Sequence, residues 1–217
     1  MILVPVKNSS SAKQRLAAIL DQPSRTELAQ AMLYDVLTAL HHWKQRPQVG
    51  VVTSDPYATK LAAEYKFDII PDPENPGETG AIEMATQVCV ERGIEYTLVI
   101  PADIPLIQGW ELEEILKQAP AEGSVLVPAG DRRGTNAAFR RPANLFPLRF
   151  GNDSFKPHLT AAMATGLPCI TLSLPGIALD IDNPDDLRKL ASSPGETRSQ
   201  RLARQWDLAE FPLAANE

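Results

Sequence analysis

Residues 2–16 read ILVPVKNSSSAKQRL, in which an apolar run passes into a polar loop with small residues and three cations. The run Ile2–Val6 is typical of a buried strand. Lys7, Lys13 and Arg15 lie on the loop, and such a loop can wrap a polyphosphate with backbone N–H groups and cationic side chains. A solvated surface loop is the alternative interpretation. Because neither G-x-x-x-x-G-K-[ST] nor G-x-G-x-x-G occurs here, neither a P-loop nor a dinucleotide-binding fold is indicated.

Strand and helix patterns alternate along the rest of the chain. The predicted strands are Ile2–Val6, Val49–Thr53, Asp68–Ile70, Tyr96–Ile100, Ser124–Val127 and Cys169–Leu172. The predicted helices are Ser24–His42, Pro56–Tyr65, Thr79–Gly93, Glu111–Gln118, Asp153–Thr165 and Pro184–Leu190. This alternation predicts a single α/β domain with three αβα layers around a mostly parallel sheet. The segment Gly134–Pro147 interrupts it, and there we expect a loop with short strands inserted at one edge of the sheet.

The composition is that of an ordinary globular chain. No apolar run among its 217 residues reaches the ~20 residues that a membrane span needs. With a net charge of −6, the chain lacks the overall positive charge that is typical of nucleic-acid-binding proteins. Cys89 and Cys169 lack a metal-ligand spacing, and a strand begins at once without a secretory signal, so we expect reduced thiols and a cytoplasmic location. We expect one domain over residues 1–190 and a C-terminal tail over residues 191–217, and a homodimer is left open.

Three carboxylates stand out, one after a predicted strand and two on an extended segment near the C-terminus. In an open parallel sheet, ligands bind beyond the carboxyl ends of the strands. Asp103 stands there between two prolines, where it can hold Mg²⁺ or stabilise a Pro-rich turn. Asp180 and Asp182 point the same way on an extended segment and repel each other unless a cation lies nearby. We therefore favour a metal there, although Asp182 or Asn183 is also a natural cap for the helix that starts at Pro184.

Other polar residues lie at neighbouring strand ends. Thr53 is a candidate contact for a base or ribose, whereas Asp55 before Pro56 is interpreted as a helix cap. The clusters Gly134–Asn136 and Phe150–Ser154 offer hydroxyl and backbone N–H groups, the second at a helix N-terminus that suits an anion or a simple cap. His158 on that helix is left open as a packing residue, a cap or a site contact.

In this order the motifs resemble the 2-phospho-L-lactate guanylyltransferase family of coenzyme F420 biosynthesis, which includes phosphoenolpyruvate and 3-phosphoglycerate guanylyltransferases. The matching segments are Val4–Leu16, Ala31–Leu37, Val51–Asp55, Pro101–Leu106, Gly134–Asn136, Phe150–His158 and Asp180–Leu187. The P-A-D-x-P motif is common to many nucleotidyltransferases, whereas G-T-N, F-G-x-x-S and D-x-D-x-P in this order are more specific. One segment departs from the pattern, because Gly77-Glu78-Thr79 stands where the family usually carries G-L-N.

The resemblance implies a nucleotidyltransferase domain of the glycosyltransferase-A-like type with a Rossmann-like sheet. The implied Mg²⁺ ligands are Asp103, Asp180 and Asp182. The implied contacts of the acceptor phosphate are Thr135, Gly151 and Ser154, and those of the nucleotide triphosphate are Lys7, Lys13 and Arg15. We thus predict Asp103, Lys13 and Arg15 as catalytic groups and Lys7, Thr53, Thr135, Gly151 and Ser154 as substrate contacts.

The expected reaction transfers GMP from GTP to the phosphate of a three-carbon acid and releases pyrophosphate. The acid is 2-phospho-L-lactate, phosphoenolpyruvate or 3-phosphoglycerate, and we expect no nucleic acid or membrane partner. A phosphate monoester is mostly dianionic at neutral pH because its second pKa is ~6, so no general base is needed. The alternatives are another nucleotidyltransferase of the same fold, of the sugar-phosphate or molybdopterin type, and a non-catalytic nucleotide-binding protein. A non-catalytic nucleotide-binding protein would not need Asp103, Asp180 and Asp182 together at its site.

Overall fold

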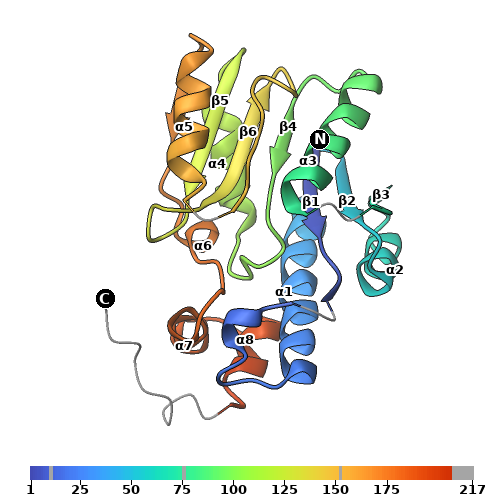
Figure 1. Ribbon diagram of the computed structural model, residues 1–217, viewed down its shortest axis with the longest axis vertical. Coiled ribbons are helices and arrows are strands. Elements are labelled where there is room, and N and C mark those ends of the chain that lie inside the picture. Colours follow the sequence, from blue (N-terminus) through green and yellow to red (C-terminus); the bar gives the residue numbers. More distant parts are fainter. Residues whose placement is uncertain (10–11, 75–76, 152, 207–217) are drawn as a thin grey trace.

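A central sheet of seven strands organises the protein, in the order β3-β2-β1-β4-β6-β5-β7 (Figure 1). The computed structural model describes residues 1–9, 12–74, 77–151 and 153–206. The strands are β1 Ile2–Val6, β2 Val49–Thr53, β3 Asp68–Pro71, β4 Thr97–Val99, β5 Gly123–Pro128, β6 Thr135–Arg141 and β7 Cys169–Thr171. The helices are the 3₁₀ helix η2 Gln14–Leu16, and α1 Gln22–His42, α2 Pro56–Glu64, α3 Glu78–Glu91, α4 Gly109–Gln118, α5 Phe155–Ala164, α6 Pro175–Ala178, α7 Pro184–Ser192 and α8 Arg198–Ala203.

Most strand pairs are parallel, which confirms the predicted α/β class. The strand β1 pairs in parallel with β2 and β4, β2 with β3, and β5 with β7. Side chains of β1 alternate between two cores. Ile2 and Val4 pack with residues of α1, α2 and α4 on one face, and Met1 and Leu3 pack with residues of α3 and α5 on the other. The helices therefore cover both faces of the sheet, as the three-layer prediction requires.

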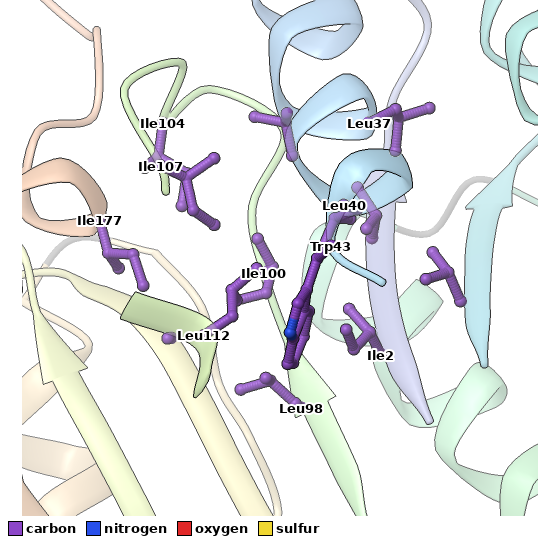
Figure 2. Close-up of a cluster of buried hydrophobic side chains, with 14 of the residues drawn as sticks. Ile2, Leu37, Leu40, Trp43, Leu98, Ile100, Ile104, Ile107, Leu112 and Ile177 are labelled. Carbon is purple, nitrogen blue, oxygen red and sulfur yellow. The ribbon is translucent and has the colours of Figure 1, made fainter. Parts of the chain in front are cut away.

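The first of these cores surrounds Trp43, which follows the end of α1 (Figure 2). Leu37 and Leu40 reach it from α1, and Ile2 and Leu98 reach it from β1 and β4. All four of these aliphatic side chains are buried. This packing fixes α1 against the strands whose carboxyl ends carry the polar loops.

The strand β6 corrects the expectation of an edge loop over residues 134–147. It lies between β4 and β5, antiparallel to both, and so runs inside the sheet. Its sequence, TNAAFRR, contains small residues and two arginines rather than a β-branched run, so no strand pattern marks it. Arg140 is nevertheless buried, because its guanidinium donates hydrogen bonds to the Phe146 carbonyl and to the hydroxyls of Thr86 and Thr97.

A third core joins the C-terminal helices to the start of α1. Leu187 and Leu190 of α7 and Leu202 of α8 pack with Leu28 and Met32 of α1. The described part of the predicted tail therefore lies against the domain, whereas residues 207–217 fall outside the described residues. None of the helices in the described segments combines the length and apolar composition needed to cross a membrane.

Candidate active site

A cavity of about 530 Å³ opens at the carboxyl ends of β1 and β4, lined by loops that are far apart in the sequence. Because β6 runs antiparallel to β4, its first residues lie at this same edge. The predicted site residues that line the cavity are Lys7, Lys13, Arg15, Asp103, Thr135, Gly151, Ser154, Asp180 and Asp182. Thr53 alone of the predicted set is not among the lining residues.

Thr53 and Asp55 stabilise the edge of the site from within the protein. Thr53 is buried, and its hydroxyl donates to the Val6 carbonyl (2.9 Å) and accepts from the Asp55 N–H (2.9 Å). Asp55 caps α2 as predicted, accepting from the Ala58 N–H at 2.9 Å, and its other oxygen accepts from the N–H and hydroxyl of Ser9. Burial opposes ionisation of Asp55, but the bonds from Ser9 and Ala58 outweigh it and lower its pKa. Its carboxylate thus fixes the loop after β1 to the start of α2.

Lys13 joins three distant segments of the chain. Its Nζ lies 2.6 Å from Asp103 Oδ2 and 2.9 Å from Asp182 Oδ1, and Arg15 Nη1 lies 3.3 Å from Asp182 Oδ2. Burial lowers the pKa of the Lys13 ammonium, but the two carboxylates outweigh burial and raise the pKa above its ordinary value. Burial raises the pKa of the Asp182 carboxyl, but the positive charges of Lys13 and Arg15 outweigh burial and lower this pKa below its ordinary value. Lys13 is therefore a cation at neutral pH.

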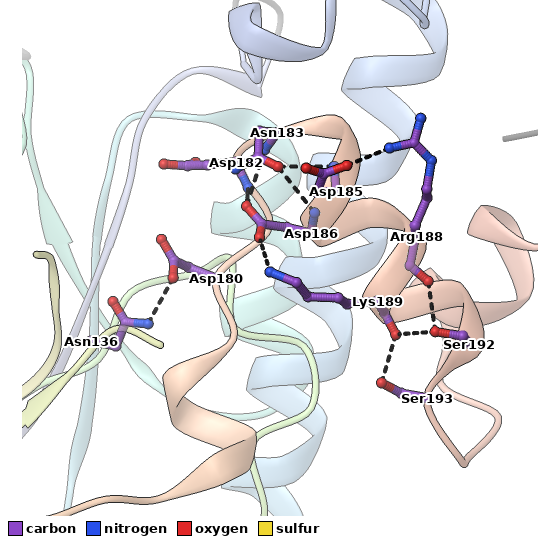
Figure 3. A network of polar contacts seen from close by, with 10 residues as sticks. All are labelled: Asn136, Asp180, Asp182, Asn183, Asp185, Asp186, Arg188, Lys189, Ser192 and Ser193. Atoms are coloured by element: carbon purple, nitrogen blue, oxygen red, sulfur yellow. Dashed lines mark hydrogen bonds and ion pairs between the residues drawn. The ribbon is translucent and has the colours of Figure 1, made fainter. Parts of the chain in front are cut away.

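Asp180 lies on the same segment as Asp182, and both carboxylates point to the same side of it (Figure 3). Asp180 Oδ1 accepts from Asn136 Nδ2 at 3.0 Å, an amide held in turn by the Ile177 carbonyl at 2.9 Å. Burial raises the pKa of Asp180, and the negative charges of Asp103 and Asp182 add to the effect. The helix α7 is capped by Asn183, one of the two predicted candidates.

The donor set fits a hard divalent cation, because carboxylate oxygens are the ligands that Mg²⁺ prefers. The carboxylates are not gathered around one point, however. Within the described segments, no three His, Cys, Asp or Glu side chains are grouped closely enough to hold a metal ion. The ammonium of Lys13 instead bridges Asp103 and Asp182 and supplies the positive charge that these carboxylates need.

Thr135, Gly151 and Ser154 all line the cavity, and we call this group, with its two hydroxyls, the hydroxyl pocket. The Thr135 N–H donates to Ser154 Oγ at 3.0 Å, although the two residues are 19 positions apart. Gly151 has φ +142°, and a Cβ placed on it would meet no atom within 4 Å. Asp153 turns away to Arg133, with which it forms an ion pair. The pocket therefore offers hydroxyl groups and open space next to an approachable backbone.

The segment that departs from the family pattern also reaches the site. Glu78 lines the cavity, and burial raises its pKa to about 7, with Asp103 adding to the shift and Lys7 and Lys13 opposing it. Thr79 has a different role: its hydroxyl accepts from the Phe150 N–H at 2.9 Å and so supports the loop before Gly151. Asn136 was not predicted as a functional residue, and its position beside Thr135 in the G-T-N motif was the signal that could have identified it.

The chain has the single-domain α/β fold of the nucleotidyltransferases, with the cavity at the carboxyl ends of β1 and β4. A solved structure from Desulfovibrio desulfuricans G20, assigned provisionally to the nucleotide-diphospho-sugar transferases, matches with a TM-score of 0.75 at 19% identity. The match covers 94% of this chain and 93% of that one, and at this identity it shows the fold alone. The particular family follows from the sequence: the model of the "Guanylyl transferase CofC like" family matches residues 1–209, and the chain belongs to this family of nucleotidyltransferases.

Two relatives illustrate the range of the family. A phosphoenolpyruvate guanylyltransferase of Roseiflexus castenholzii is 36% identical over 204 residues, which cover 94% of this chain and 93% of the relative. A 3-phospho-D-glycerate guanylyltransferase of Colwellia psychrerythraea is 32% identical over 206 residues, which cover 94% and 97%. Nucleotidyltransferases of this kind generally use a divalent metal.

Proposed function

We propose that this protein transfers GMP from GTP to the phosphate of a small phosphorylated acid and releases pyrophosphate, as a step in coenzyme F420 biosynthesis. The observation that carries the proposal is that one cavity contains a cationic loop, three carboxylates and a hydroxyl pocket. The names of the relatives support phosphoenolpyruvate and 3-phosphoglycerate as acceptors, and the motif resemblance adds 2-phospho-L-lactate.

The proposed reaction requires positive charge around the phosphates rather than a general base. An oxygen of the acceptor phosphate attacks the α-phosphorus of GTP, and the bond from that phosphorus to the bridging oxygen breaks, so that pyrophosphate leaves with the electron pair. The attacking group is already a dianion at neutral pH, so no proton has to be removed from it. The barrier comes from bringing two anions together, and cationic side chains lower it by stabilising the charge that moves to pyrophosphate.

Each group of residues has a part in this proposal. Lys7, Lys13 and Arg15 neutralise the triphosphate, and Thr135, Gly151 and Ser154 bind the acceptor phosphate. The residues that would hold Mg²⁺ are Asp103, Asp180 and Asp182. Bound Mg²⁺ would supply further positive charge at the phosphates. Because Lys13 bridges Asp103 and Asp182, Mg²⁺ held by these carboxylates would compete with its ammonium.

A pyrophosphate-release assay tests the proposal. The three acceptors are crossed with GTP, ATP, CTP and UTP in the presence of Mg²⁺. We expect release with GTP and at least one of the acids, and none without an acid or with EDTA. Failure of every acid would contradict the proposed reaction and favour the sugar-phosphate or molybdopterin type, or a nucleotide-binding protein without catalysis.

We also propose a cytoplasmic location, which the free thiols of Cys89 and Cys169 support.

A further inference from the structure

His158 is a buried histidine with a hydrogen bond at each ring nitrogen. Only 1% of the residue is exposed. The backbone N–H of Arg149 donates to Nε2 at 2.7 Å, and Nδ1 lies 2.9 Å from the hydroxyl oxygen of Thr135. The ring is also in edge contact with Phe150, with 5.1 Å between the ring centroids. His158 thus connects the loop before Gly151 with the first residue of β6.

The two partners fix the position of the ring proton. A backbone N–H can only donate, so Nε2 of His158 must accept and carries no proton. A neutral imidazole has one N–H, which must then be on Nδ1 and must point at Thr135 Oγ1. Burial, together with the positive charge of Arg140, lowers the pKa of His158 to about 4. The ring is therefore neutral at pH 7, with a single defined tautomer.

This tautomer determines what the pocket presents to a ligand. Thr135 Oγ1 accepts from His158, so its own O–H proton is free to be donated to another group. Ser154 Oγ accepts from the Thr135 N–H at 3.0 Å and has its own proton to donate in the same way. Both residues line the cavity. Each hydroxyl oxygen already accepts a hydrogen bond from the protein, so each hydroxyl proton can be donated to a ligand. Two such donors favour an anion.

We propose that His158 is a positioning residue, which by donating from Nδ1 to Thr135 fixes that hydroxyl as a hydrogen-bond donor to the phosphate of the acceptor. This inference rests on the proposed function, because it takes the anion in the pocket to be the acceptor phosphate. The chemical class recognised is a fully ionised phosphate monoester, which has acceptor oxygens but no hydrogen to donate.

Two substitutions separate this role from a merely structural one. In His158→Asn the side-chain amide nitrogen can take the position of Nδ1 and keep the bond to Thr135 while the bond from Arg149 is lost. In His158→Gln the longer side chain can place its oxygen at the position of Nε2 and keep the bond from Arg149, while the bond to Thr135 is lost. We expect His158→Gln to raise KM for the acceptor about tenfold, with little change for GTP, and His158→Asn to raise it less.

A double-mutant cycle tests whether His158 acts through Thr135. Once Thr135→Val has removed the hydroxyl, His158→Gln should raise the acceptor KM no further. The proposal is overturned if folded His158→Gln keeps a normal acceptor KM, if His158→Asn is the more damaging variant, or if the effects of His158→Gln and Thr135→Val multiply. A parallel rise of both KM values also overturns it, since that pattern indicates a general structural role.

The tautomer itself can be measured in the unchanged protein, which removes any dependence on the folding of variants. In a protein labelled with ¹⁵N-histidine, NMR at pH 7 should show His158 protonated at Nδ1 and not at Nε2. The exposed His41 and His42 are assigned by substituting each with Gln. A proton on Nε2 would overturn the proposed hydrogen bond from His158 to Thr135. If no acceptor supports pyrophosphate release, the proposed function fails. This spectrum and its response to added inorganic phosphate still test the role of His158.

Discussion

Lys13 is the residue on which the charge balance of the site depends. Its backbone is in the left-handed region at φ +54°, which directs the side chain from the loop after β1 toward two carboxylates. Carboxylates this close to each other repel unless a cation lies between them. In the structure that cation is the ammonium of Lys13. If Mg²⁺ binds these carboxylates as proposed, it has to compete with this ammonium.

Replacing Lys13 should have opposite effects on nucleotide and metal. In Lys13→Met, KM for GTP should rise by about 10- to 150-fold, because a hydrogen bond to a charged group contributes ~1.5–3 kcal/mol. Without nucleotide, Mg²⁺ should raise Tm more in this variant than in the wild type, because it no longer competes with the ammonium. Thermal unfolding with and without Mg²⁺ measures the second effect. Equal Mg²⁺ shifts in the two proteins would contradict the competition.

Asp103 should be essential for turnover but not for folding. Asp103→Asn keeps the size of the side chain and removes the charge that faces Lys13, so we expect at least a ~100-fold loss of kcat/KM with little change in Tm. The half-buried Asp68 contacts Gln48 and Arg92 and does not line the cavity, so Asp68→Asn serves as the matched control. Normal Mg²⁺-dependent activity in folded Asp103→Asn would show that this carboxylate is not part of the catalytic machinery.

Among the elements, β6 brings Thr135 to the cavity that the loops with Lys13 and Asp103 also line. Val99 of β4 pairs with Ala138, so the antiparallel strand carries Thr135 past the carboxyl end of β4. The following loop then returns to α5, where the Phe155 N–H donates to the Arg133 carbonyl at 2.8 Å. One strand and one helix start therefore build the hydroxyl pocket.

Local patterns account for the elements that were predicted and for those that were missed. The parallel strands have β-branched runs, and the caps Asp55 and Asn183 occur at their expected places, so these were found. The strand β6 has no such run, because a buried guanidinium takes a place in it that apolar residues usually fill. The bridge from Lys13 to residues 90 and 169 positions away has no local signature at all. Thr53 stands at the end of a strand, where a ligand contact is expected, yet its hydroxyl donates to the Val6 carbonyl.

Gly151 tests the acceptor pocket at the level of its loop. Gly151→Val introduces a side chain at φ +142°, where it is strained, and directs it into the open space of the cavity. We expect the acceptor KM to rise strongly while GTP binding is retained. Gly166 at φ +74° also has no atom within 4 Å of an added Cβ and does not line the cavity, so Gly166→Val gives strain without filling the site. An equal rise of the acceptor KM in both variants would attribute the effect to strain.

In the whole molecule, the C-terminal helices hold the segment that carries Asp180 and Asp182. The helix α7 follows that segment directly, and it packs with α8 on the start of α1 (Figure 1). Asp35 of α1 fixes α8 by accepting from the backbone N–H groups of Arg198 and Ser199, both at 2.8 Å. No described residue after Asp182 lines the cavity, so the described C-terminal helices support the site through their packing on α1.

Asp35→Asn should therefore weaken the fold. The amide can accept from one of the two N–H groups but places its own N–H against the other, and the charge is lost. We expect a loss of ~1.5–3 kcal/mol in the free energy of unfolding, measured by urea titration. The exposed Glu113 on α4 provides the control Glu113→Gln. A wild-type stability in Asp35→Asn would mean that α8 is not held by this carboxylate.

The pH dependence of stability should contain a contribution from His158. Burial and Arg140 lower its pKa from 6.5 to about 4 in the folded protein, so the unfolded chain binds a proton in the interval between these values and the folded protein does not. Stability must therefore fall as the pH drops below 6.5, by at most ~1.4 kcal/mol per pH unit from this group. His158→Asn cannot titrate, so the stability advantage of the wild type over this variant should shrink between pH 7 and about pH 5. Urea unfolding of both proteins across this range measures the difference, in which the contributions of the carboxylates common to both cancel. Parallel stability curves would mean that His158 is protonated as easily in the folded protein as in the unfolded chain, and its ring could not then have the single tautomer on which the orientation of Thr135 depends.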